Sequence, residues 1–462
     1  MTLFHWLTLH GFVTTLAILF YALQSHGAPQ RRQPAAAIAW MLFIVLIPYL
    51  ALPAYAVFGT RKRPRPHTMV LADHVPGPPE RWAIDTLLAL GQPAPAAYEK
   101  LAIHPDGEAA QASLLAALTR AQHSIDLCTF ILANDPLGEA VLSILCEQAR
   151  AGVRIRLLLD GMGSLMTRPP DLQPLRDAGG EFAIFASPLR SSLRGRTNLR
   201  DHRKLVLIDG DQAHGQLWTG GRNLAAEYFT GVAGTPPWRD LSFELSGPLI
   251  CQAGQLFERD WRFAQGLPAP IETPTSLNLR NMTANEGAQL VASGPDQADD
   301  TVHALLLSAA YRAQRRIALV TPYFVPDTSL LMALCLAVRR GVQVDLLLPE
   351  RSNHRLSDFA RGRALRSLAQ AGGRIWLAQG MHHAKLAVID DTLALAGSAN
   401  LDSRSLFLNY EMVLAFHQSA DIHRFEAWFD TEGAPARGFQ PKQPGLLRDM
   451  AEGLILWTAF QL

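Results

Sequence analysis

The sequence predicts an α/β protein in which two α/β/α halves, related by a pseudo-twofold axis, follow a transmembrane helical hairpin. Three observations predict this fold. Two long stretches near the amino terminus carry no charge, the remaining chain repeats a set of short motifs, and each repeat alternates apolar runs with helical patterns. With 462 residues, 48% hydrophobic and 18% charged, the chain is long enough for several domains and too apolar to be intrinsically disordered.

The charge balance and the cysteines exclude several classes of protein. Lys and Arg number 42 against 41 Asp and Glu, a net charge of +1, so we expect no nucleic-acid partner. The four cysteines are far apart and form no C-x-x-C pair, which argues against a disulfide framework and a structural zinc site. Reduced thiols in a protein that faces the cytosol are the simpler interpretation.

The predicted hairpin occupies residues 1–60. Its uncharged stretches, residues 3–23 and 35–58, each reach the roughly 20 residues that a membrane-spanning helix needs. Pro48 and Pro53 should kink the second span. The alternative for the first stretch, a cleaved signal peptide, is disfavoured because no Lys or Arg precedes it.

Basic residues indicate how the hairpin is oriented. Two arginines lie between the stretches, whereas four basic residues follow the second, namely Arg61, Lys62, Arg63 and Arg65. The positive-inside rule then places both ends of the hairpin in the cytoplasm, which predicts a multi-pass membrane protein whose later domains lie on the cytoplasmic side. A Pro-rich linker is expected over residues 61–100.

The remaining chain states nearly the same pattern twice, which predicts a first domain over residues 101–275 and a second over residues 276–462. Each half also contains a helical pattern that ends at a glycine. A site between two such halves would receive one copy of each motif. In chain order the matching segments are residues 124–131 and 316–323, 151–159 and 340–348, 177–180 and 370–373, and 202–209 and 383–390.

The last matching pair carries the chemistry. His202 and Lys204 are two residues apart at the start of an apolar run, so on a strand both side chains project from the same face. His383 and Lys385 repeat this spacing. Each apolar run ends at an aspartate, and a later motif in each half supplies an asparagine; these residues are Asp209 and Asp390, and Asn223 and Asn400.

This set suits displacement at a phosphodiester without a metal or other cofactor. An imidazole can attack phosphorus or protonate a leaving oxygen, while Lys and Asn hold the charged oxygens. Only five of the basic residues are lysines, and two of them occupy the same motif position. A single such run would more often be a strand-end histidine beside a solvated lysine, but two copies favour function. Asp209 and Asp390 are candidates for the catalytic set, with turn or ion-pair anchors as the alternative.

The paired H-x-K-x-x-x-x-D motifs resemble those of the phospholipase D superfamily, over about residues 101–416. Within it the chain is most similar to the bacterial cardiolipin synthases. This resemblance implies a covalent phosphohistidine intermediate and conversion of two phosphatidylglycerol molecules into cardiolipin and glycerol. The resemblance also implies a place in the bacterial inner membrane. The points of likeness are the amino-terminal hairpin with residues 37–40, residues 238–240 before 247–248, and residues 321–327, 397–405 and 408–411.

The resemblance also implies roles for further residues. An acidic residue supports each histidine in the family, which points to Asp240 and Glu411; surface carboxylates are the alternative. Ser398 joins the asparagines as a residue that supports the site or binds substrate. By analogy His202 is the nucleophile and His383 the general acid. Two departures are Asp201, where many relatives have asparagine, and Asn353, which replaces a more usual aspartate and so puts an acid/base role there in doubt.

Two segments could contact lipid. Basic residues alternate with leucines over residues 188–204, which suggests a seat for an anionic headgroup, with a solvated basic loop as the alternative. The apolar tail over residues 446–462 could lie in the membrane interface or dock on the core. The expected partners are therefore the bilayer and anionic phospholipids, and the oligomeric state is open. A hydrolase of lipid or nucleic acid, and a non-catalytic scaffold, are the competing functions.

Overall fold

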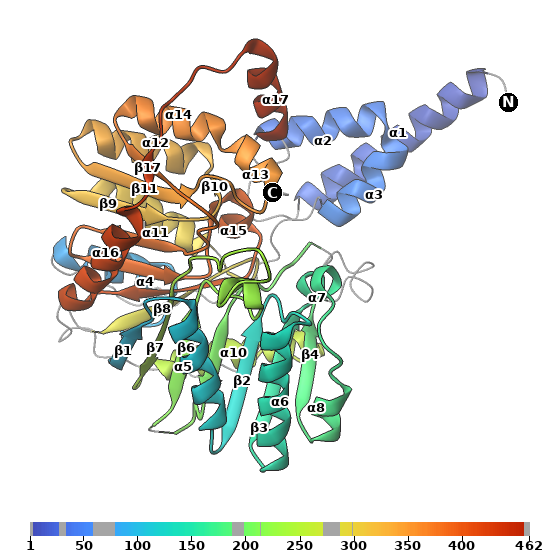
Figure 1. Ribbon diagram of the computed structural model, residues 1–462. Coiled ribbons are helices and arrows are strands. Elements are labelled where there is room, and N and C mark those ends of the chain that lie inside the picture. Colours follow the sequence, from blue (N-terminus) through green and yellow to red (C-terminus); the bar gives the residue numbers. More distant parts are fainter. Residues whose placement is uncertain are drawn as a thin grey trace.

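The computed structural model describes residues 3–26, 34–58, 79–186, 198–212, 214–270, 287–297 and 299–456 (Figure 1). Two α/β halves lie one above the other in this view, each built on its own sheet. In the first half the strand order is β1-β7-β6-β5-β2-β3-β4. These strands are β1 Glu99–Ile103, β2 Ser124–Thr129, β3 Arg154–Asp160, β4 Glu181–Phe185, β5 Leu205–Ile208, β6 Gln216–Gly220 and β7 Ser242–Ser246.

The second sheet repeats this order as β8-β16-β14-β13-β9-β11-β12, with β17 added beside β12. The predicted pair of α/β halves is therefore confirmed, and the shared strand order shows that the two sheets have the same topology. The strands are β8 Ala288–Ser293, β9 Arg316–Val320, β11 Gln343–Pro349, β12 Arg374–Ala378, β13 Leu386–Ile389, β14 Leu393–Gly397, β16 Glu411–Phe416 and β17 Arg437–Gly438, and a separate two-stranded sheet pairs β10 Phe324–Val325 with β15 Leu401–Asp402.

Helices cover both sheets, and corresponding aspartates start two of them. Asp135 accepts hydrogen bonds from the amides of Leu137 and Gly138, and Asp327 accepts them from Ser329 and Leu330. The first half contains α5 Gly107–Thr119, α6 Pro136–Arg150, α7 Gly161–Thr167, α8 Gln173–Asp177, η3 Ala226–Tyr228 and α10 Ile250–Gln265. The second contains α11 Thr301–Arg312, α12 Thr328–Arg339, α13 Arg355–Ala360, α14 Gly362–Ala371, α15 Ser403–Phe407, α16 Ser419–Gly433 and α17 Leu446–Leu456.

A shared hydrophobic core fixes the two halves against each other. Phe243 of β7 packs edge-on against Phe416 of β16 and Phe425 of α16, with ring centroids 5.7 and 5.8 Å apart. The same core includes Phe257 from α10. Because buried aromatic side chains carry much of the packing energy of a core, this contact sets the relative position of the two halves, and hence of any site between them.

The amino-terminal segment folds into α1 Leu3–His26, α2 Pro34–Leu46 and α3 Pro48–Phe58 (Figure 1). The helical run breaks at Ile47, before Pro48, as expected, whereas Pro53 lies inside α3 without a break in the helix. Tyr21 and Tyr55 are buried where these helices pack together, with ring centroids 5.2 Å apart. We expected two membrane-crossing helices here. Within the described ranges, no helix combines the length and the apolar character needed to cross a bilayer.

The range expected to be a linker, residues 61–100, contains helical structure in its described part, residues 79–100. The structure forms η1 Pro79–Arg81 and α4 Trp82–Ala89 within that range. Trp82 and Leu87 are buried in the core of the second half, among residues of α11 such as Leu305. The Pro-rich composition of the segment conceals these apolar positions, which stabilise a helix once they meet a core.

The carboxyl-terminal tail docks on the second half through α17. Buried Glu452 accepts a 2.5 Å hydrogen bond from Arg366 of α14, and Asp449 pairs with Arg363. Residues 457–462 of the tail lie outside the described residues, as do Arg190, Arg194 and Arg196 of the expected lipid-binding segment.

Candidate active site

The two H-x-K motifs meet at the junction of the halves. In each sheet the strand that carries the motif, β5 or β13, runs antiparallel to its neighbour β2 or β9. The histidines precede these strands, so they lie at the edge where the parallel strands end. There the backbone amide of His202 donates to the carbonyl of Tyr410, and that of His383 donates to the carbonyl of Arg239, at 2.9 and 2.7 Å.

Each histidine is held by a carboxylate from the opposite half. Nδ1 of His202 lies 3.0 Å from Oε2 of Glu411, and Nδ1 of His383 lies 2.7 Å from Oδ2 of Asp240. Both carboxylates are buried. A carboxylate at Nδ1 keeps the proton on that nitrogen and leaves Nε2 free to act as nucleophile or base.

The two carboxylates are themselves fixed by neighbouring groups. Glu411 accepts hydrogen bonds from the hydroxyls of Ser398 and Ser405 at 2.5 and 2.6 Å, and from the amide of Asn409. In the first half Gly221 takes the place of Ser398, and a side chain there would clash with Asp240. Burial on its own raises the pKa of Asp240, but His383 and Lys385 outweigh it and bring this pKa down to about 2.

Both lysines are buried beside their histidines. Nζ of Lys204 donates to the carbonyl of His202 at 2.6 Å. Nζ of Lys385 lies 2.8 Å from Nδ1 and 3.0 Å from Nε2 of His383. Burial lowers the pKa of Lys204 to about 8 and that of Lys385 to about 7. Both ammonium groups are therefore poised to lose or share a proton near neutral pH.

The lysine of each motif affects the pKa of the histidine in the other motif. Burial lowers the pKa of His383 to about 3, and the charges of Lys385 and Lys204 add to this shift. Burial also lowers the pKa of His202, and Lys204 and Lys385 act in the same direction against the opposing charge of Glu411. The two motifs thus share one electrostatic environment at the junction. The side chain of His202 is 12% exposed and that of His383 is 4% exposed.

The two asparagines add buried polar groups that lack partners. The amide nitrogen of Asn223 donates to the hydroxyl of Tyr228 at 2.8 Å. The side-chain oxygens of both Asn223 and Asn400 have no hydrogen-bond partner in the described part of the chain. Because buried polar atoms are seldom left unsatisfied, these amides indicate a place for a polar ligand.

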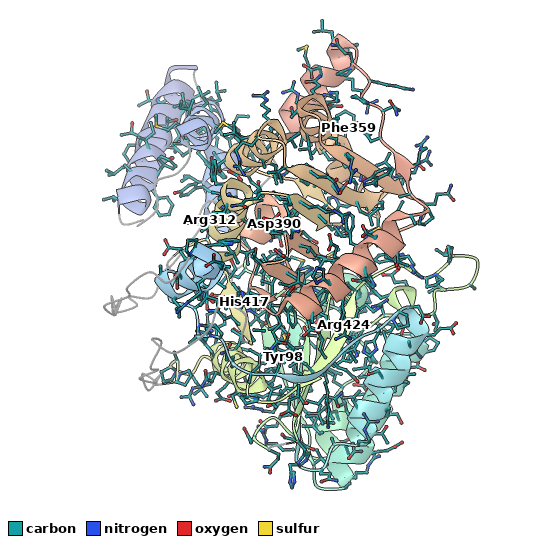
Figure 2. All side chains as sticks on the ribbon, turned by 90° about the vertical axis from the view of Figure 1, so that its left-hand side faces the viewer. Tyr98, Arg312, Phe359, Asp390, His417 and Arg424 are labelled. Carbon is teal, nitrogen blue, oxygen red and sulfur yellow. The ribbon has the colours of Figure 1, made fainter. Side chains whose placement is uncertain are left out.

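Asp209 and Asp390, which we counted with the catalytic set, are not brought to the site. Asp209 lies at the far end of β5 from His202 and accepts hydrogen bonds from the backbone amides of residues 122–124. Asp390, which is labelled in Figure 2, directly follows β13 and does the same for the backbone amides of residues 314–316. Both have a positive φ, 48° and 51°, as expected of turn anchors.

The two departures from the family pattern have different surroundings. The backbone amide of buried Asp201 donates to Asp160 at 2.7 Å, so Asp201 belongs to the wall behind His202. The side-chain oxygen of Asn353 accepts a 2.6 Å hydrogen bond from the hydroxyl of Tyr323. An amide in this position cannot exchange a proton as an aspartate could.

The placement of Arg203 in the basic segment expected to face lipid was wrong, because Arg203 ties the two halves together behind His202. Its guanidinium donates to both oxygens of Asp260 at 2.5 Å and to the carbonyls of Glu411 and Ser293 at 3.2 and 3.4 Å. Arg203 is fully buried. The signal was available, because the matching position in the second motif is Ala384, so only one half requires an arginine there.

Aromatic side chains around the histidines were also missed. The ring of Phe130 packs edge-on against that of His202 with centroids 5.3 Å apart. The rings of Tyr228 and Trp238 lie 5.0 and 5.7 Å from that of His383. These rings restrict the orientation of each imidazole. They come from η3 and from segments between the strands, whose spacing in the sequence gives no indication of the contact.

Comparison with known families agrees with this geometry. The model of the family described as "Cardiolipin synthase, PLD-like domain" matches residues 114–235 and 306–432, one segment in each half. A second model, described as "Phospholipase_D-nuclease N-terminal", matches residues 13–59. Both copies of the H-x-K motif lie inside the first match.

Curated relatives and solved structures extend the comparison. The chain is 30% identical over 457 residues to cardiolipin synthase A of Pseudomonas putida, covering 94% of this chain and 93% of the relative. It is 30% identical over 430 residues to cardiolipin synthase 1 of Bacillus cereus, covering 87% and 84%. The crystal structure of a phosphatidylserine synthase of Haemophilus influenzae shares the fold, with a TM-score of 0.63 at 11% identity, over 83% of this chain and 100% of that one.

Proposed function

Since this chain belongs to the phospholipase D superfamily and, within it, to the bacterial cardiolipin synthase family, we propose that it joins two phosphatidylglycerol molecules to form cardiolipin and glycerol. It is a phosphatidyltransferase of that superfamily. The observation that carries the proposal is the crossed pair of contacts, Asp240 with His383 and Glu411 with His202. This arrangement orients one imidazole from each half, and we propose that both act on the phosphorus of one phosphodiester.

In the first step, Nε2 of His202 attacks the phosphorus of phosphatidylglycerol. A nitrogen–phosphorus bond forms, the bond from phosphorus to the headgroup glycerol oxygen breaks, and His383 gives that oxygen a proton. The greater exposure of His202, 12% against 4%, supports its role as the group that substrate reaches.

In the second step the roles reverse. The terminal hydroxyl of a second phosphatidylglycerol attacks the phosphorus and gives its proton to His383, and the nitrogen–phosphorus bond breaks. One phosphodiester has replaced another, so the exchange needs no nucleotide, metal or other cofactor. Water in place of the second alcohol would give phosphatidic acid instead.

The lysines and asparagines support both steps. Lys204 and Lys385 would hold the phosphate oxygens, whose negative charge increases toward the transition state, and Asn223 and Asn400 would donate to these oxygens through Nδ2. Lys385 lies within 3.0 Å of Nε2 of His383, so the two can share a proton. Bound phosphate adds a negative charge that favours the protonated imidazole, and this raises the low pKa that His383 has in the free protein.

The amino-terminal helices are proposed to insert as a hairpin into the bacterial cytoplasmic membrane, with the catalytic halves on the cytoplasmic side. Exposed apolar side chains on α1 and α2 support this, among them Phe12 at 63%, Leu23 at 66% and Leu46 at 70%. The basic residues that follow α3 in the sequence favour the cytoplasmic orientation.

A product assay tests the proposed reaction. The full chain, reconstituted in vesicles, is given phosphatidylglycerol with a labelled headgroup, and the products are identified by mass. We expect cardiolipin and free glycerol in equal amounts from the wild type, and neither from the His202→Asn or His383→Asn variant. The variant His423→Asn, which changes an exposed histidine of α16, is the matched control and should behave as the wild type. Phosphatidic acid as the sole lipid product would overturn the proposal in favour of a hydrolase.

A further inference from the structure

Two short helices beside the site expose apolar side chains to solvent. In α7, Leu165 and Met166 are 64% and 72% exposed, and in α13 Leu356 is 53% exposed. One exposed apolar residue needs no explanation. Here the feature occurs at corresponding places in both halves, because α7 follows β3 and α13 follows β11, the equivalent strand of the second sheet.

Helix α7 is part of the wall beside His202. One carboxylate oxygen of Asp160 caps α7 by accepting hydrogen bonds from the backbone amides of Met162 and Gly163. Its other oxygen accepts a hydrogen bond from the backbone amide of Asp201, the residue before His202. Any side chain at Gly163 would clash with the carbonyl of Phe130, whose ring packs against His202. The exposed end of α7 is therefore held rigidly at the His202 side of the site.

The segment that leads into α13 lies on the His383 side. Its Asn353 accepts a hydrogen bond from Tyr323, and the ring of His354 lies 6.0 Å from that of Tyr323. The hydroxyl of Thr321, in the same segment as Tyr323, accepts a 3.2 Å hydrogen bond from the amide of Leu401, which follows Asn400 of the site. The two exposed apolar groups thus flank the two histidines.

Exposed arginines accompany the apolar side chains in both places. Arg168 directly follows α7, and Arg351 and Arg355 precede and begin α13. Apolar side chains beside arginines are the combination that binds the interface of an anionic bilayer, because the apolar groups enter the lipid while the guanidinium groups meet the phosphates.

Helix α17 extends this surface. Its Ile455 packs against Ala360 of α13, and its Glu452 faces Arg366 of the second half. On its outer face Leu446, Leu447 and Met450 are 76%, 83% and 63% exposed. In Figure 1, α7, α13 and α17 lie toward the side of the molecule on which α1–α3 are found.

We propose that these exposed side chains form a rim that seats the mouth of the site on an anionic bilayer, separately from the amino-terminal helices. The rim consists of Leu165, Met166, Leu356, Leu446, Leu447 and Met450. The inference rests on the proposed function, because a lipid headgroup must reach the histidines. It adds that the catalytic halves touch the bilayer themselves, on both sides of the site.

The test compares two pools of substrate with one preparation. The full chain is reconstituted in vesicles of phosphatidylcholine and supplied either with long-chain phosphatidylglycerol in the bilayer or with short-chain phosphatidylglycerol dissolved as monomers. The triple variant Leu165→Gln, Met166→Gln and Leu356→Gln should lose about tenfold or more of its rate on the bilayer pool and keep its rate on the monomers. Tyr311→Gln, which changes an exposed residue near the end of α11, is the control and should keep both rates.

A second measurement does not depend on activity. Leu165→Trp and Leu447→Trp place a fluorophore on the rim, and vesicles with brominated acyl chains should quench its emission, whereas Tyr311→Trp should not be quenched beyond the wild type. The proposal that the rim contacts the bilayer would be overturned by equal rates of the triple variant and the wild type on the bilayer substrate, or by rim tryptophans that are not quenched. An equal loss of rate on the bilayer and monomer substrates would also overturn it, because these residues would then be needed for the reaction or for folding rather than for membrane contact. A wild type that forms no cardiolipin from either pool, with rim tryptophans still quenched, would instead refute the proposed reaction.

Discussion

Asp240 and His383 meet across the two halves, with Oδ2 2.7 Å from Nδ1, although 143 residues separate them in the chain. Glu411 and His202 make the reciprocal contact at 3.0 Å. Each half therefore supplies the histidine of one pair and the carboxylate of the other. Neither half contains a complete site, so activity requires the packing of both.

The first prediction concerns the charge at Nδ1. Asp240→Asn keeps the size of the side chain but removes the negative charge that holds the imidazole and stabilises its protonated form. We expect kcat for cardiolipin formation to fall roughly 10²- to 10⁴-fold. Steady-state rates on phosphatidylglycerol vesicles measure this, and a thermal melt checks that the variant is folded. A folded variant with the wild-type rate would show that Asp240 has no part in the chemistry.

The second prediction is a pH dependence set by the lysines. Burial lowers the pKa of Lys385 to about 7 and that of Lys204 to about 8, so each ammonium is charged below its pKa and loses its proton as the pH rises through it. Because the charged forms hold the phosphate, kcat/KM should fall from pH 7 upward.

Two lysine-to-arginine variants test whether Lys385 causes this fall in kcat/KM. In Lys385→Arg the guanidinium stays charged up to a pH of about 12, so the lower of the two alkaline steps should disappear, at a reduced overall rate. Lys442→Arg changes an exposed lysine and should keep the wild-type profile. A profile that is unchanged in Lys385→Arg would exclude this lysine as the titrating group.

The third prediction separates Asp209 from catalysis. Burial favours the protonated form of Asp209, but the hydrogen bonds that its carboxylate accepts from backbone amides outweigh this effect and lower its pKa. The charged carboxylate therefore stabilises the folded protein at neutral pH, and this stabilisation is lost in acid. Asparagine tolerates a positive φ as aspartate does, so Asp209→Asn should preserve the backbone conformation. The variant replaces hydrogen bonds to a charged carboxylate by hydrogen bonds to a neutral amide, which should reduce the free energy of unfolding by about 1.5–3 kcal/mol. Denaturant unfolding measures this loss. The kcat of the folded variant should stay at the wild-type value, and a large fall in kcat without a loss of stability would return Asp209 to the catalytic set.

The fourth prediction concerns the buried pair of Arg203 and Asp260. Arg203→Met leaves the carboxylate of Asp260 buried without its partner, which should cost about 3–5 kcal/mol of stability. The double variant Arg203→Met and Asp260→Leu removes both charges and should recover most of this loss. Unfolding in denaturant measures both variants. A double variant no more stable than the single one would mean that the ion pair itself is not what Arg203 contributes.

The repeat in the sequence was enough to predict both α/β halves and the meeting of His202, Lys204, His383 and Lys385, because each half carries one copy of the motif directly before the same strand of its sheet. The resemblance to the phospholipase D superfamily pointed to Asp240 and Glu411 as the residues that support the histidines. It could not tell which carboxylate supports which histidine, since that depends on how the two halves pack through Phe243 and Phe416.

Other features depended on contacts that no local pattern encodes. Asp209 and Asp390 follow the motif so closely that the sequence grouped them with it, but the length of the strand carries them to its far end. Helix α4 was hidden in a Pro-rich segment because its stability comes from the core it covers. Arg203 and Phe130 act through partners that are distant in the chain.

Trapping the intermediate tests the central claim most directly, namely that His202 and His383 act in turn on one phosphorus atom. The variant His383→Asn lacks the general base of the second step, so we would give it a phosphatidyl ester of p-nitrophenol, a leaving group that needs no acid. After an alkaline quench and digestion, we predict that mass spectrometry finds the phosphatidyl group on the peptide that contains His202. Release of p-nitrophenol without an adduct, or an adduct on another residue, would contradict the account.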